Sequence, residues 1–212
     1  NGWSIPGGQK YHGPRMRYAE GDWSNAAFWL VAGAIGGSIG CQGLDMESPQ
    51  GDRAIAALLE EFGAETKVVL NQITATHKEM KGIRIDASQI PDLVPILCVA
   101  AAAAEGKTEI YNAGRLRMKE SDRLAVMAEC MQKIGVEVEE KPDSIIITGG
   151  CNPPEGEIVI DSHNDHRIVM AMAIAAVSLG VELTILGAEA VNKSYPSFFI
   201  ELAKLGGVTN VL

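Results

Sequence analysis

The chain has 212 residues, of which 47% are hydrophobic and 21% are charged. This composition excludes a disordered tail, a collagen-like fibre and a small domain held together by disulfides. The net charge of −9 argues against a nucleic-acid partner, because proteins that bind the phosphate backbone use a broad basic face.

The ends and the cysteines set further limits. Residues 1–13 are rich in glycine and have no signal-peptide pattern, so we expect a linker stub between domains, followed by a globular domain over 14–212. The longest apolar run, 93–104, is shorter than the roughly 18 residues that a membrane-spanning helix needs, so we expect no membrane partner. The cysteines are widely spaced and form no CxxC pair, which favours a reducing, cytoplasmic compartment; they are Cys41, Cys98, Cys130 and Cys151.

A repeat of about 70 residues organises the chain into units at about 14–80, 81–150 and 155–212. Each unit begins with a polar residue before an apolar stretch, and a second helical stretch follows. The second unit predicts a strand at 82–86, a helix at 92–105, a strand at 107–111, a helix at 120–134, and strands at 136–140 and 144–148. This order is βαβαββ. The third unit stops before its final strand, so we expect something outside the chain to complete that sheet.

The first helix of each unit has almost no polar face, as in the five alanines at 100–104, and such a helix must be buried on all sides. The second helices are amphipathic. The sequence therefore predicts an α/β fold of three βαβαββ units about a pseudo-threefold axis, with helices inside and sheets outside.

In that arrangement the N-termini of the buried helices lie at one end of the domain. Their unpaired N–H groups and partial positive charge make that end a candidate anion site. Asp22, Asp92 and either Asn164 or Asp165 are also suited to be ordinary N-caps, which is the structural alternative for all of them.

Three charged clusters lie at helix starts, at 115–123, 163–167 and 192–196. Taken singly, they fit a solvated helix start, a His-x-x-His pair and an exposed loop lysine. We expect no metal at the histidines, because no third ligand accompanies them. Taken together, they place three cations at one end, where they would converge on an anionic ligand with two carboxylates, Asp92 and Glu120, as proton-handling groups; the cations are Arg123, Arg167 and Lys193.

These motifs resemble the C-terminal half of the 5-enolpyruvylshikimate-3-phosphate synthase family. The resemblance covers nearly the whole chain and rests on the following motifs: Gly8-Gln9-x-Tyr11, Glu20-Gly21-Asp22-x-Ser24, Ile90-Pro91-Asp92, Arg117-x-Lys119-Glu120-Ser121-Asp122-Arg123, Asn164-Asp165-His166-Arg167 and Lys193-Ser194-Tyr195-Pro196.

The resemblance implies an enolpyruvyl transferase-like fold and a reaction between phosphoenolpyruvate and shikimate 3-phosphate, with no metal or organic cofactor. Asp92 would hold the shikimate hydroxyls and act as the base, and Lys119 would contact the same ring. Arg123 and Arg167 would bind phosphoenolpyruvate.

The resemblance further implies that Glu120 and Lys193 handle protons at the enolpyruvyl carbon and the departing phosphate, with Asp165 and His166 in support. Some members have Asn where this chain has Arg115, so no role is transferred to that position. The family's N-terminal domain is absent from this sequence, and we expect the chain alone to be inactive. A non-catalytic binding domain and a UDP-N-acetylglucosamine enolpyruvyl transferase are the alternatives.

Overall fold

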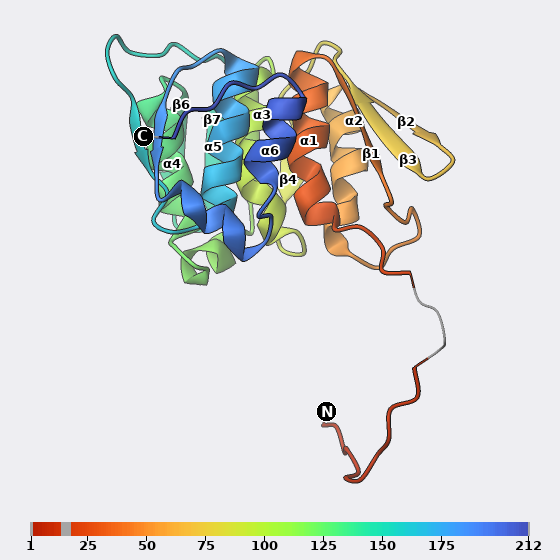
Figure 1. Ribbon diagram of the computed structural model, residues 1–212. Helices are drawn as coiled ribbons and strands as arrows, with labels where there is room; N and C mark the ends of the chain where they lie inside the picture. Colours follow the sequence, from red (N-terminus) through yellow and green to blue (C-terminus); the bar gives the residue numbers. More distant parts are fainter. Residues whose placement is uncertain (1, 14–17, 212) are drawn as a thin grey trace.

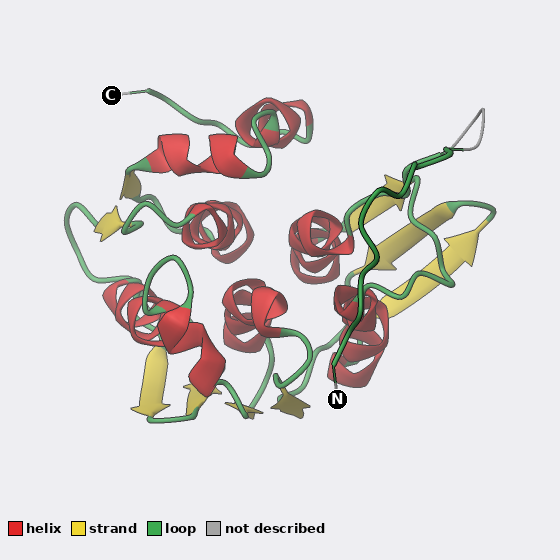
Figure 2. Ribbon diagram, turned by 90° about the horizontal axis from the view of Figure 1, so that it is seen from below, coloured by secondary structure: helices red, strands yellow, loops and turns green. Residues whose placement is uncertain are grey.

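The computed structural model describes residues 2–13 and 18–211 (Figure 1). Three apolar helices form its centre: α1 (Trp23–Gly36), α3 (Val94–Ala103) and α5 (His166–Leu179). Each of the three contacts the other two, and most of their side chains are fully buried. Figure 2 views the helices nearly end-on, with the strands toward the outside. The predicted arrangement of helices inside and sheets outside is confirmed.

The second unit has the complete βαβαββ order that the sequence predicts. Its mixed sheet has the strand order β4-β5-β7-β6, with β4 and β5 parallel and the other pairs antiparallel. Its elements are β4 (Arg84–Asp86), η2 (Pro91–Leu93), α3, β5 (Lys107–Tyr111), η3 (Gly114–Met118), α4 (Arg123–Lys133), β6 (Glu137–Lys141) and β7 (Ser144–Thr148).

The first unit, within the described residues, begins directly with α1. It continues with β1 (Ser38–Gln42), η1 (Gly51–Ala54), α2 (Ile55–Phe62), β2 (Glu65–Val69) and β3 (Gln72–Thr76). The three strands form an antiparallel sheet in the order β1-β3-β2. Helix α1 lies directly on this sheet: a Cβ added at Gly33 would be 2.6 Å from the carbonyl oxygen of Ala75, so the close approach requires glycine.

The third unit consists of β8 (Val159–Asp161), α5, β9 (Thr184–Leu186), η4 (Ala188–Lys193) and α6 (Phe198–Lys204). Strands β8 and β9 form a two-stranded parallel sheet, with the register Asp161 to Leu186 at one end. In the described part of the chain no helix is long and apolar enough to cross a bilayer.

The predicted helix at 120–134 begins later than expected. Helix α4 starts at Arg123, where Asp122 is the N-cap and accepts a hydrogen bond from the backbone of Ala125 at 3.1 Å. Residues 119–122 are irregular and connect η3 to α4. The charged Lys119 and Glu120 therefore lie on a short loop and not on a helix.

Candidate active site

The three buried helices start at the same end of the molecule, and the chemistry of each start is set by its cap. Asp22 accepts from the backbone N–H of Ser24 at 2.9 Å, and Asp165 accepts from that of Arg167 at 3.0 Å, so both are N-caps as predicted. The same interpretation of Asp92 is wrong. Because Pro91 begins the helical turn, the cap position falls on Ile90, and the carboxylate of Asp92 is left for other contacts.

The repeat places Asp92 and Arg167 at equivalent positions. Strands β4 and β8 both end at an aspartate whose side chain accepts from the backbone N–H two residues later, and the offset that aligns these aspartates also aligns Asp92 with Arg167. In the structure Nη2 of Arg167 lies 3.4 Å from Oδ2 of Asp92. One position of the repeated unit thus supplies a carboxylate in the second unit and a guanidinium in the third, and the two groups face each other.

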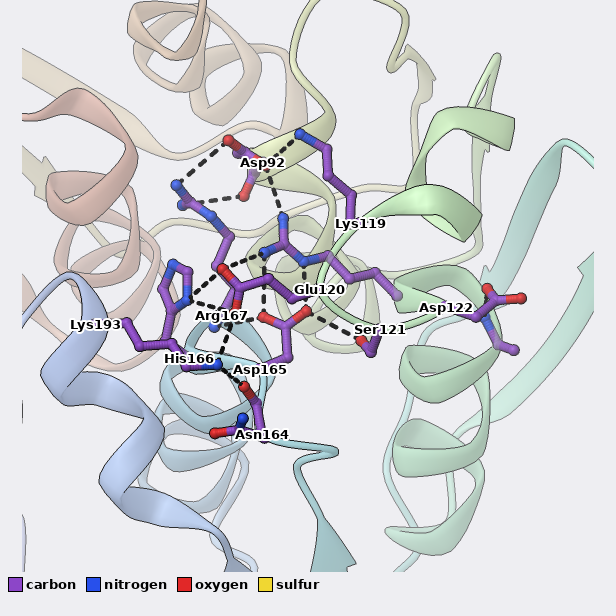
Figure 3. A network of polar contacts seen from close by, with 12 residues as sticks. Asp92, Lys119, Glu120, Ser121, Asp122, Asn164, Asp165, His166, Arg167 and Lys193 are labelled. Atoms are coloured by element: carbon purple, nitrogen blue, oxygen red, sulfur yellow. Dashed lines mark hydrogen bonds and ion pairs between the residues drawn. The ribbon is translucent and has the colours of Figure 1, made fainter.

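Arg123 joins the second unit to the third, because it pairs with Asp92 of the second unit and Asp165 of the third, both labelled in Figure 3. Its side chain is only 3% exposed. Nε donates to Oδ2 of Asp165 at 2.7 Å, Nη2 donates to Oδ1 of the same residue at 3.2 Å, and Nη1 donates to Asp92 at 2.7 Å. Asp165 is fully buried and also accepts from the hydroxyl of Ser121 at 3.0 Å. Arg123 and Asp165 are therefore each held by more than one hydrogen-bond partner.

The Asp92 carboxylate is surrounded by cations. Besides the two arginines, Nζ of Lys119 lies 3.2 Å from Oδ1. Burial raises the pKa of Asp92, but the charges of Arg167, Lys119 and Arg123 outweigh it, so the net pKa lies below its ordinary value. The pKa of Asp165 is lowered in the same way: burial raises it, and the hydrogen bonds and charge of Arg123 lower it by more.

Glu120 is the centre of a second group. It lies 3.2 Å from Nδ1 of His166 and accepts from Nζ of Lys193 at 3.2 Å. Lys193 also donates to the backbone carbonyl of Asn164. Asn164 adopts a left-handed conformation, with φ of 56°, which turns its carbonyl toward the lysine.

All eight residues predicted for the site thus lie in one network, because Nη2 of Arg123 is 3.9 Å from Glu120 and links the two groups. The network holds three carboxylates and four permanent cations, in a chain with a net charge of −9. Ligand atoms of Glu120, Asp165 and His166 also lie within 4.8 Å of one another. Since Lys193 and Arg123 already pair with the two carboxylates, this trio is better described as part of the ion-pair network than as a metal centre.

Sequence reasoning missed a buried carboxylate beside the site. Asp52, only 9% exposed, accepts from the hydroxyl of Ser24 in the first turn of α1. Burial raises the pKa of Asp52. No local pattern could reveal this contact, because it joins residues 28 positions apart.

Comparison with known proteins supports one family. A family model described as EPSP synthase (3-phosphoshikimate 1-carboxyvinyltransferase) matches residues 1–202. This chain belongs to the EPSP synthase family. The resemblance drawn from the motifs is thereby confirmed.

Relatives within the EPSP synthase family are similar over nearly all of this chain. The 3-phosphoshikimate 1-carboxyvinyltransferase of Clostridium acetobutylicum is 48% identical over 205 residues, which make up 96% of this chain and 46% of that protein. The Pyrococcus abyssi protein of the same name is 43% identical over 210 residues, or 97% of this chain and 49% of that protein. The chain spans about half the length of the curated relatives it matches.

Solved structures agree on the fold. The EPSP synthase from Acinetobacter baumannii matches with a TM-score of 0.71 and 32% identity, over 88% of this chain and 46% of that chain. The enolpyruvyl transferase NikO from Streptomyces tendae matches with a TM-score of 0.71 at 20% identity, over 89% of this chain and 44% of that chain, which supports the fold alone. The predicted enolpyruvyl transferase-like fold is confirmed.

Proposed function

We propose that this chain supplies one side of the active site of a 3-phosphoshikimate 1-carboxyvinyltransferase. The enzyme would transfer the carboxyvinyl group of phosphoenolpyruvate to the 5-hydroxyl of shikimate 3-phosphate and release phosphate. The observation that carries the proposal is the pair of largely buried guanidinium groups, Arg123 and Arg167, which both pair with Asp92.

Phosphoenolpyruvate has a carboxylate and a phosphate, both of which suit the planar donor fork of arginine. In the structure Arg167 pairs with Asp92, and Arg123 gives Nη1 to Asp92 while its Nε and Nη2 donate to Asp165. Binding of phosphoenolpyruvate would replace Asp92 as the partner of Arg123 and Arg167 and leave the carboxylate with fewer cations. Its pKa would then rise, and Asp92 would become a stronger base for the attacking hydroxyl.

The proton steps divide between the two groups of the network. The 5-hydroxyl oxygen would bond to C2 of phosphoenolpyruvate and lose its proton to Asp92, while the methylene carbon would gain a proton from Glu120 or Lys193. Loss of phosphate and of one methyl proton would then restore the double bond. His166, 3.2 Å from Glu120, would orient that carboxylate.

The remaining parts of the site would come from a second domain. We propose that residues 14–212 form one domain, in three units, that 1–13 connect it to a partner domain, and that the two close on the substrates. The four thiols are all unpaired, which supports a cytoplasmic location as part of the same proposal.

Complementation tests this function. The chain is mixed with the part of the Clostridium acetobutylicum relative that it does not match, and phosphate release from phosphoenolpyruvate is measured with shikimate 3-phosphate or with UDP-N-acetylglucosamine as the acceptor. We expect release with shikimate 3-phosphate alone. Release with the nucleotide sugar would favour a UDP-N-acetylglucosamine enolpyruvyl transferase. Inactivity of correctly folded, associated halves would favour a non-catalytic binding domain.

A further inference from the structure

Arg117 belongs to the motif that ends at Arg123, yet it lies outside the network described above. Each nitrogen of its guanidinium nevertheless donates a hydrogen bond. Nη1 donates to both carboxylate oxygens of Asp122, at 3.3 and 3.0 Å. Nη2 donates to Glu140 and to the carbonyl of Lys141, both at 2.7 Å, and Nε donates to the carbonyl of Pro142 at 2.9 Å. All three guanidinium nitrogens of Arg117 therefore donate, and the two contacts to Asp122 share one Nη1.

The two sets of acceptors belong to different parts of the second unit. Glu140, Lys141 and Pro142 lie at the tip of the β6–β7 hairpin, at the outer edge of the sheet. Asp122 ends the irregular segment 119–122 and caps α4. Arg117 precedes that segment, so its side chain bridges the start of the loop to its end and fastens both to the hairpin.

The loop has little structure of its own. Its backbone contributes a long hydrogen bond from Lys119 to Leu116 at 3.4 Å and one from Arg123 to Ser121 at 2.9 Å. The preceding residue, Met118, is 88% exposed. Because few backbone bonds and little burial hold the segment, side-chain contacts must set where Lys119 and Glu120 lie.

We propose that Arg117 is a positioning residue, which fastens the loop 119–122 to the β6–β7 hairpin and so holds Lys119 and Glu120 against Asp92 and His166. The catalytic side of this inference rests on the proposed function. Arg117 itself touches neither group of the network. Arg123 does not depend on this fastening, because its ion pairs with Asp165 and Asp92 hold it independently.

The test compares three variants. Arg117→Ala removes all five bonds. Asp122→Asn removes the charge of the loop-side partner and keeps a side chain that caps α4, so it tests the same link if the first variant does not fold. Arg84→Ala is the matched control, since it removes an exposed ion pair, Arg84 to Glu109 at 2.7 Å, from the same sheet. Amide hydrogen exchange is measured on each, and kcat and KM are measured in the complemented enzyme.

We expect Arg117→Ala to speed exchange about tenfold or more at the amides of Lys119 and Arg123, which the segment's two backbone bonds protect, with α3 and α5 unchanged. We expect kcat to fall about 10- to 100-fold, because a displacement near 1 Å has that effect, and KM for phosphoenolpyruvate to stay within about threefold. Asp122→Asn should also speed exchange and lower kcat, but by less. Arg84→Ala should change neither exchange nor kcat.

Unchanged exchange at the amides of Lys119 and Arg123, or an equal loss of protection throughout α3 and α5, would overturn the fastening role. Local loosening with an unchanged kcat would overturn the positioning role. If the wild-type halves show no turnover, the proposed function fails, and the exchange measurement alone then decides whether Arg117 fastens the loop.

Discussion

At the scale of single residues, the position of Asp92 between three cations explains how a carboxylate can be both a structural partner and a base. In the free chain it neutralises Arg123 and Arg167. In the proposed reaction the anionic substrate takes over those arginines and leaves Asp92 more basic. The ion pairs with the arginines keep Asp92 a weak base in the free chain. Asp92 therefore becomes a stronger base only when phosphoenolpyruvate binds.

Asp92→Asn separates these two effects. The amide cannot accept the hydroxyl proton, so turnover in the complemented enzyme should fall about 10²- to 10⁴-fold. The arginines lose a competing anion, so calorimetry should show tighter binding of phosphoenolpyruvate by the same variant. Turnover within tenfold of wild type, or weaker substrate binding, would be inconsistent with these roles.

The two arginines should differ in their effect on stability. Arg123→Ala leaves the fully buried Asp165 without its main partner, so we expect a loss of about 3–5 kcal/mol in the free energy of unfolding. Arg167 contacts the side chain of Asp92, which keeps Lys119 and Arg123, so Arg167→Ala should cost only about 1–2 kcal/mol. Urea unfolding of both variants measures the difference, and equal losses would argue against the structural role of the Arg123–Asp165 pair.

The lowered pKa values of Asp92 and Asp165 predict acid sensitivity. A carboxylate whose pKa is lower in the folded state stabilises the fold above its unfolded value of about 3.9, and this stabilisation is lost as the pH falls through the folded value. The urea midpoint should therefore drop as the pH is lowered from 5 toward 2. Asp165→Asn should start lower and show a shallower drop; a drop as steep as that of wild type would mean that other groups cause it.

At the scale of elements, the buried helices could be predicted because their chemistry is local. Continuous apolar stretches with Pro or Asp at their starts place α1, α3 and α5 to within a few residues. Two helix starts differ from the prediction. Pro91 begins the helical turn before Asp92, so Asp92 is not the cap. Asp122 caps α4, so Glu120 precedes the helix. The ion pairs, such as Arg123 to Asp165 across 42 positions, depend on how units pack and have no local signal.

The alanines of α3 allow close contact among the central helices, and this can be tested. Ala100 is fully buried in α3, and leucine there would overfill the packing around that helix. We expect Ala100→Leu to lower the free energy of unfolding by about 1–3 kcal/mol. The exposed Ala203 in α6 is the control, where leucine should change stability by no more than about 0.5 kcal/mol. Equal effects at the two sites would contradict the packing.

At the scale of the whole molecule, the repeat explains why one end of the domain gathers the charged residues. Three similar units bring three helix starts together, and each contributes a different polar residue: Ser24, Asp92 and Arg167. The repeat and the motifs were readable from the sequence, so the fold and the membership of the network could be predicted. The pairing within the network, the buried Asp52 and the fastening by Arg117 required the three-dimensional structure.

The central claim is that the shared helix end binds phosphoenolpyruvate for carboxyvinyl transfer, and Arg167→Ala in the complemented enzyme tests it most directly. This variant removes one guanidinium while the buried Arg123–Asp165 pair remains, so circular dichroism should match wild type. We predict that kcat/KM for phosphoenolpyruvate falls by about 100-fold or more, as expected for the loss of a charged donor to a reacting anion. A kcat/KM within about threefold of wild type, in a folded and associated variant, would contradict the account.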